Sequence, residues 1–222
     1  MKTTKNIFLL LFTFATLTVN GQNHLIGVTG SVNWTNVTAN NNFASDINYR
    51  TGFATGFSYD YIFKKNFIIG ADILYNQRGF TNDIIFIDEN GNPTGQKATT
   101  NFNYDYLTIP LKVGYNYGKT FYCFANTGLT PAILIDAQTI TPKIEFLPSE
   151  QNDVTDRVNK FDIGGIVEVG GGYKFEDRFW LYLSFSYQRS FTTITSSDYF
   201  ANLKIRHNGM AINIGLKYAL TK

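Results

Sequence analysis

The chain has 222 residues and a formal net charge of +2, with 19 basic and 17 acidic side chains. This balance excludes the strongly basic surface that nucleic-acid binding requires, and it excludes an acidic interaction tail. Aromatic residues make up 16% of the chain and 19 residues are glycine, a composition typical of an all-β protein. The single cysteine, Cys123, excludes an intramolecular disulfide and is interpreted as a small apolar filler.

Residues 1–21 have the features of a secretory signal peptide. Two lysines precede the apolar run IFLLLFTFATL at 7–17, and the small residue Gly21 precedes a cleavage site before Gln22. The run is shorter than the about 20 residues that a membrane-spanning helix needs. We therefore predict a cleaved signal peptide and one domain at 22–222, the alternative being a buried N-terminal helix.

Eight segments of the domain alternate apolar and polar residues with the period of two that is typical of a half-buried strand. In the stretch YDYLTIPLKVGY, for example, Leu107, Ile109 and Leu111 share one face, whereas Thr108 and Lys112 share the other. The eight predicted strands are 25–34, 49–61, 67–80, 104–115, 121–134, 161–175, 179–189 and 207–220.

The connections between these segments alternate in length. The tight turns FKKN, NYGKT and FEDR alternate with long polar links at 35–48, 81–103, 135–160 and 190–206, which is typical of an up-and-down outer-membrane barrel. Aromatic residues flank each tight turn, as in YIFKKNF, and predict a girdle at the membrane interface. Within the second link, DIIFIDENGNPTG predicts a hairpin with its turn at Asn90-Gly91.

The composition of the two strand faces indicates which one is inside. The face opposite the apolar one carries glycine, alanine, serine and asparagine with scattered charges, which suits the narrow interior of an eight-stranded barrel. A closed barrel also pairs every backbone group in hydrocarbon. The sequence therefore predicts an all-β protein, an eight-stranded antiparallel up-and-down transmembrane β-barrel. Pro110 cannot donate a ladder hydrogen bond, so we predict a β-bulge there.

Four stretches carry a resemblance to a known family: YNQRGF at 75–80, YLTIPLKVGY at 106–115, FDIGGIVEVGGGYKF at 161–175 and INIGLKY at 212–218. Over 22–218 the chain resembles the PorT-like outer-membrane β-barrel domain family of Gram-negative bacteria. The resemblance implies an integral outer-membrane barrel of about eight strands, and some members of the family are components of secretion systems. The sequence departs from the family in ending with YALTK instead of an aromatic residue.

Seven charged side chains fall on the predicted inner face. They could form a polar path through the barrel or a structural ion network that fills it. Since an eight-stranded barrel is too narrow for an aqueous channel, we interpret them as a structural network. Four lie in the half of the barrel near the tight turns and three lie nearer the long loops: Asp72, Lys112, Glu168 and Lys217 in the first group, and Arg50, Arg78 and Asp162 in the second.

Residues able to support catalysis are few. His24 and His207 begin the first and last predicted strands, which places them at opposite ends of a barrel. Ser190, Ser196 and Ser197 precede His207, so an envelope-lipid hydrolase is a minor alternative. The sequence shows no zinc-ligand spacing, GGIVEVGGG lacks the ending of a phosphate-binding loop, and DENGNP lacks the closing glutamate of a calcium loop. We predict no catalytic, metal or cofactor site.

These observations favour a non-enzymatic integral outer-membrane protein. Its barrel would anchor four long extracellular loops for surface display or partner docking, with any specificity in 81–103 and 135–160. The alternatives are a component of an outer-membrane secretion or assembly machine, the hydrolase, and a secreted soluble ligand-binding barrel. The expected partners are outer-membrane lipid and envelope or secretion-machine proteins, with no nucleic acid and no small-molecule substrate.

Overall fold

The structure, a computed structural model, describes most of the predicted domain. The predicted signal peptide lies outside the described residues, and so do several loop segments. Within the described part, no helix is long and apolar enough to cross a membrane. The described residues are 23–39, 47–87, 90, 93–143, 148–176, 178–195 and 204–220.

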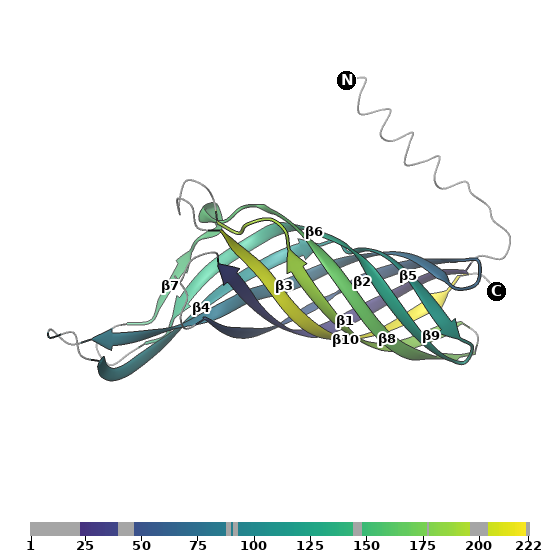
Figure 1. The fold of residues 1–222 in the computed structure, drawn as a ribbon, viewed down its shortest axis with the longest axis horizontal. Coiled ribbons are helices and arrows are strands. Elements are labelled where there is room, and N and C mark those ends of the chain that lie inside the picture. Colours follow the sequence, from purple (N-terminus) through teal and green to yellow (C-terminus); the bar gives the residue numbers. More distant parts are fainter. Residues whose placement is uncertain are drawn as a thin grey trace, which may run out of the picture.

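Ten strands form one antiparallel sheet that curls into a barrel (Figure 1). A short 3-10 turn, η2 (Thr155–Arg157), lies in the link between β7 and β8. The strands are β1 (Asn23–Ala39), β2 (Ile47–Phe63), β3 (Phe67–Ile87), β4 (Pro93–Thr108), β5 (Leu111–Gly118), β6 (Phe121–Thr141), β7 (Glu150–Asp153), β8 (Phe161–Phe175), β9 (Phe179–Ser190) and β10 (Ile205–Ala219).

The sheet closes on itself. The pairing runs β2-β1-β10-β9-β8-β6, continues through β4 and β5 to β3, and returns to β2 because β2 and β3 also pair. This closing pair extends from Phe63 opposite Phe67 to Ile47 opposite Asn82. Since β4 and β5 share one position in the wall and β7 lies outside it, the ring has eight strands. The predicted eight-stranded antiparallel up-and-down barrel is confirmed.

The break between β4 and β5 corrects the prediction of a bulge at Pro110. Thr108 pairs with Leu74 and Leu111 pairs with Ala71, so β3 keeps the same register on both sides of the break. The ladder is interrupted because proline has no N–H to donate. The bulge lies higher in the wall, where the register between β4 and β6 shifts after Asp105.

The two faces of the wall differ as predicted. On β5, Leu111 and Val113 point outward and are 50% and 54% exposed. On β4 and β5, Tyr106, Thr108 and Lys112 point inward and are at most 6% exposed. The same alternation holds around the ring, where outward Phe, Val, Ile and Leu side chains oppose inward Ser, Thr, Asn and charged ones. This apolar outer surface meets lipid.

Three tight turns close one end of the barrel, and aromatic rings stack beside them. Lys64, Lys65, Gly118 and Glu176 have positive φ angles in these turns. These ring pairs lie beside the tight turns, where the girdle is predicted. Ring centroids are 5.4 Å apart for Phe63–Phe67, 4.9 Å for Phe121–Tyr173 and 5.4 Å for Phe175–Phe179.

At the other end, strands extend further than the sequence predicts. The link at 135–160 is not an irregular loop, because β6 continues to Thr141 and pairs with β7 from Gln138 opposite Asp153 to Thr141 opposite Glu150. The predicted hairpin within 81–103 is confirmed, since β3 and β4 pair up to Ile87 opposite Pro93. Both hairpins stand beyond the ring in Figure 1.

Candidate functional site

The lower half of the lumen, nearer the tight turns, holds a three-residue charge layer. Lys112 of β5 has its Nζ 2.7 Å from Asp72 Oδ2 on β3 and 3.4 Å from Glu168 Oε2 on β8. Glu168 also accepts hydrogen bonds from Asn126 Nδ2 at 2.9 Å and from Ser184 Oγ at 2.7 Å. One ammonium group therefore pairs with two buried carboxylates, one on the neighbouring strand β3 and one on β8, which lies beyond β6.

A second ion pair lies beside this layer. Lys217 of β10 pairs with Asp60 of β2, and its Nζ lies 4.9 Å from the ring centre of Tyr182. Lys217, Asp60, Lys112 and Glu168 line one cavity of about 20 Å³, so the two groups of charges lie at the same depth. Sequence analysis omitted Asp60 from the charge set, although the alternation of its strand places it on the inner face.

The upper half, nearer the long loops, holds a separate ion pair between Arg78 of β3 and Asp162 of β8. Arg78 Nη1 lies 2.8 Å from Asp162 Oδ2, and Arg78 Nη2 donates to Thr108 Oγ1 at 3.2 Å. Asp162 also accepts a hydrogen bond from Ser190 Oγ at 2.7 Å. Arg50 does not join this pair, because its Nη1 donates to the carbonyl oxygen of Arg78 at 3.4 Å. That these pairs stabilise the barrel stays a prediction, tested below.

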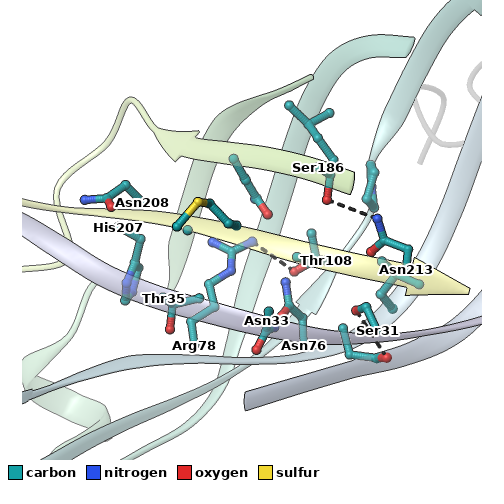
Figure 2. Close-up of a pocket in the computed structure, with 18 of the residues that line it drawn as sticks. Ser31, Asn33, Thr35, Asn76, Arg78, Thr108, Ser186, His207, Asn208 and Asn213 are labelled. Atoms are coloured by element: carbon teal, nitrogen blue, oxygen red, sulfur yellow. Dashed lines mark hydrogen bonds between the residues drawn. The ribbon is translucent and has the colours of Figure 1, made fainter. Parts of the chain in front are cut away.

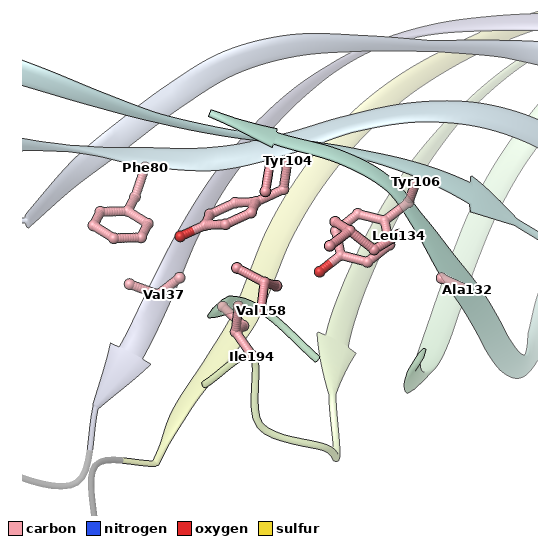
Figure 3. Packing of buried hydrophobic residues seen from close by; sticks show 9 residues of the cluster. Val37, Phe80, Tyr104, Tyr106, Ala132, Leu134, Val158 and Ile194 are labelled. Atoms are coloured by element: carbon pink, nitrogen blue, oxygen red, sulfur yellow. The ribbon is translucent and has the colours of Figure 1, made fainter. Parts of the chain in front are cut away.

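Apolar clusters close both ends of this polar lumen. The loop-side plug brings strand side chains of β1, β3, β4 and β6 together with Val158 and Ile194 from the links (Figure 3). The turn-side plug includes Trp180, and Lys174 Nζ lies 3.7 Å from its ring centre. The loop-side plug consists of Val37, Phe80, Tyr104, Tyr106, Ala132, Leu134, Ala137, Val158 and Ile194, and the turn-side plug of Leu25, Ile62, Ile68, Tyr122, Trp180, Tyr182 and Ala219.

Among the described residues, the histidines and serines lie apart and do not assemble into a catalytic group. His24 lies at the turn end, with Nδ1 2.8 Å from a tyrosine hydroxyl. His207 lies at the loop end, is 3% exposed, and has Nε2 3.5 Å from another tyrosine hydroxyl. Ser190 donates to the carboxylate that pairs with the buried arginine. Ser196 and Ser197 lie outside the described residues.

Metal ligands and reactive thiols give no further site. In the part of the chain that the structure describes, no group of three or more His, Cys, Asp or Glu side chains could hold a metal ion. Cys123 is exposed on the outward face, with its Sγ 3.7 Å from the carbonyl oxygen of Tyr117. It therefore faces lipid, and the interpretation of Cys123 as a filler within packed protein is wrong.

The hairpin of β3 and β4 forms a two-stranded ribbon above the wall. β3 pairs with β2 only as far as Asn82, and β4 pairs with β6 only as far as Asn101. Beyond these points, residues 83–87 and 93–100 pair with each other and with no other strand among the described residues. We call these residues the ribbon. Within the described part of the chain, no third strand pairs with either edge of the ribbon.

Several solved outer-membrane protein structures resemble the chain at low sequence identity. Neisserial surface protein A is 11% identical, with 86% of this chain and 95% of that chain covered and a TM-score of 0.44. OprG from Pseudomonas aeruginosa is 10% identical, with 91% and 97% covered and a TM-score of 0.45. The outer membrane protease OmpT from Escherichia coli is 11% identical, with 91% and 98% covered and a TM-score of 0.45. No curated protein matches the sequence.

A family model gives a more direct assignment. The model described as outer membrane protein beta-barrel domain matches residues 20–196, which span β1 through β9. The match agrees with the closed ring of eight strands and with its apolar outer surface. The chain therefore belongs to the outer membrane protein beta-barrel domain family and is an integral protein of the outer membrane of Gram-negative bacteria.

Proposed function

We propose that the protein is a non-enzymatic docking protein whose barrel anchors the ribbon on the cell surface. The observation that carries this proposal is the pairing of the ribbon, whose two strands pair with each other and with no third strand among the described residues. An exposed strand edge can accept an extended segment of another protein, since the new strand completes the backbone hydrogen bonds. The partner we propose is such a segment of an envelope protein.

The side chains of the ribbon suit recognition by strand addition. Ile85 is 44% exposed, and Lys97 and Thr99 on the facing strand are also exposed. Thr99 Oγ1 donates to Asp83 Oδ1 at 2.7 Å, which fixes the two strands across the base of the ribbon. In strand addition, backbone groups supply affinity and alternate side chains supply specificity. Ile85 is an apolar side chain among polar ones, so the ribbon can discriminate between partner strands by the side chain that meets Ile85.

The absence of an enzymatic role is part of the proposal. What supports it is that the potential catalytic groups have structural contacts. Ser190 is 2% exposed and donates a hydrogen bond to a carboxylate, and His207 is buried next to Tyr106. A lipid substrate would have to reach a nucleophile in contact with a base. Loss of lipid turnover in a His207→Ala variant would instead favour the envelope-lipid hydrolase.

A component of a secretion or assembly machine is the second candidate. The finer assignment to the PorT-like family supports it, through YLTIPLKVGY, which forms the end of β4, the break at Pro110 and most of β5. The ribbon partner would then be another component of that machine. Identification of the captured protein distinguishes this candidate from a general docking role.

Site-specific photo-crosslinking in intact cells tests the proposal. A benzophenone amino acid replaces Lys97 in the ribbon, and the matched control places it at Lys160, which is also exposed but lies in the β7–β8 link, directly before β8. We expect a defined larger adduct with the Lys97 probe and none with the Lys160 probe. No adduct at Lys97, or the same adduct at both positions, would contradict docking on the ribbon.

A further inference from the structure

The upper half of the lumen contains a chamber that the ion pairs do not explain. It has a volume of about 60 Å³ and lies around Arg78 (Figure 2). The loop-side plug is next to it, because the Arg78 guanidinium carbon lies 4.9 Å from the ring centre of Tyr106. Ten of its 19 lining residues carry amide or hydroxyl side chains, including Asn33, Asn76, Ser186 and Asn213. A cavity needs about 10–15 Å³ to hold one water molecule, so a chamber of about 60 Å³ has room for roughly four.

Three buried polar atoms of residues that line this chamber have no hydrogen-bond partner among the described residues. They are Asn33 Oδ1, Arg78 Nε and His207 Nδ1, on side chains that are 5%, 2% and 3% exposed. Buried polar atoms are seldom left unpaired, because their desolvation is not compensated. Asn33 Oδ1 is an acceptor and Arg78 Nε is a donor, so a molecule in the chamber must both donate and accept hydrogen bonds. The positive charge of Arg78 is already neutralised by Asp162, so an uncharged occupant fits better than an ion.

The roof of the chamber differs from its walls. Seven residues of the loop-side plug lie on strands of the ring, whereas Val158 and Ile194 lie in the links β7–β8 and β9–β10. The two links hold each other: Val158 forms a bridge with Thr195, and Asn159 N donates to Ile194 O at 2.8 Å. Val158 and Ile194 reach toward Tyr104 and Tyr106 from across the mouth (Figure 3).

The floor of the chamber is the lower charge layer. An adjoining cavity of about 40 Å³ shares Ser31, Ser186 and Asn213 with the chamber and is also lined by Asp72 and Lys112. Below that layer the turn-side plug closes the barrel. Among the described residues, the route from the chamber that requires no break in the ring therefore leads past Val158 and Ile194.

We propose that the described link residues around Val158 and Ile194, 154–160 and 191–195, form a lid, and that the chamber beneath them binds water and uncharged hydrogen-bonding solutes of similar size that enter from outside the cell. Lid opening separates Val158 and Ile194 from the strands at the mouth and breaks hydrogen bonds that tie the links to those strands, such as Ile194 N to Ile205 O at 2.8 Å. The strand pairs of the ring stay intact, so among the described residues the site is a pocket entered from the loop side rather than a channel.

Thiol accessibility tests the lid. Ser186→Cys places a thiol on the chamber wall in a Cys123→Ala background, which removes the exposed native thiol. Purified protein in detergent micelles is treated with the small neutral reagent methyl methanethiosulfonate. We expect slow modification with the lid intact. After Val158→Ala and Ile194→Ala, we expect the modification rate to rise by at least about tenfold, because removing buried aliphatic groups destabilises the closed lid and so raises the fraction of time that it is open. Gln151→Cys, on exposed β7, should react equally fast in both backgrounds.

Each variant must first show the heat-dependent gel shift of a folded barrel. If the Ser186→Cys thiol reacts as fast as the Gln151→Cys thiol with the lid intact, the chamber is open and the lid proposal is wrong. If it stays slow after both truncations, the two links do not control entry. Nuclear Overhauser transfer from water to the Asn33 and Asn76 side-chain amides should be seen in the folded protein, and its absence would overturn a hydrated chamber.

Discussion

Lys112 and Asp72 form a 2.7 Å ion pair inside the barrel, across the neighbouring strands β5 and β3. Their strand neighbours point the other way, since Leu111 and Ile73 are 50% and 55% exposed on the outer face. A lysine on the lipid side near the bilayer midplane would cost roughly 2–4 kcal/mol. The pairing thus assigns the inner and outer faces of the stretch that contains Pro110.

Replacing Lys112 with methionine tests the structural role of the lower charge layer. The change leaves the carboxylates of Asp72 and Glu168 buried without their ammonium partner, and breaking a buried pair typically costs roughly 3–5 kcal/mol. We expect that loss in the free energy of unfolding, measured by denaturant in detergent micelles. Adding Asp72→Asn should cost much less than the sum of the two single changes. A more stable Lys112→Met protein would mean that the lysine faces lipid.

The two arginines of the upper half provide a matched pair of variants. Arg78→Met removes a buried ion pair with Asp162 and should also cost about 3–5 kcal/mol. Arg50→Met removes only a long hydrogen bond to a carbonyl oxygen, and we expect a loss of about 1 kcal/mol or less. The same unfolding assay compares them. Equal losses would show that the ion pair contributes nothing beyond the packing of an arginine side chain.

Closure of the ring predicts resistance to detergent. With β2 paired to β3, the wall has no edge at which unzipping can begin, so the unboiled protein should stay folded in SDS and migrate differently after boiling. Gel mobility with and without heating measures this directly. A single unchanged band under both conditions would contradict a closed ring.

The plugs and the lower charge layer predict an electrically silent barrel. Reconstituted protein should show no large steady conductance in planar bilayers, because side chains fill the eight-stranded lumen. The variant with both Val158→Ala and Ile194→Ala should stay silent, since Lys112 and the turn-side plug still block the path. Stable porin-like steps in the unmodified protein would show that the charges line an open path.

The fold was predictable because lipid contact imposes a simple rule on each strand. One face must be apolar over its whole length, so the period of two survives even where Gly170 and Gly172 weaken the strand, and tight turns separate the segments. The rule ends where the wall leaves the membrane. There β7 (Glu150–Asp153) has four exposed side chains and no apolar face, so its pairing with β6 leaves no periodic signal.

The site was predictable only in part, because alternation fixes a side chain's face but not its partner. Equal heights above two tight turns sufficed to place Lys112 next to Asp72. The partner of Lys217 depends on which strands meet when the ring closes. The positions of Val158 and Ile194 in the lumen depend on the paths of the two links that carry them. Such contacts join positions far apart in sequence, with no local pattern to mark them.

The two prolines of the wall give the barrel a mechanical weak point. The carbonyl oxygen of Pro110 accepts a hydrogen bond from the amide of Asp72 on β3, and that of Pro131 on β6 accepts one from the amide of Ile109. Neither proline has an N–H to donate in return. Two neighbouring residue pairs at one height in the wall therefore each have one backbone hydrogen bond instead of two. If β3 and β6 are pulled from the membrane by an atomic force microscope tip, we expect the force trace to drop at this level. The upper part of the barrel would then yield as one mechanical unit and the lower part as another.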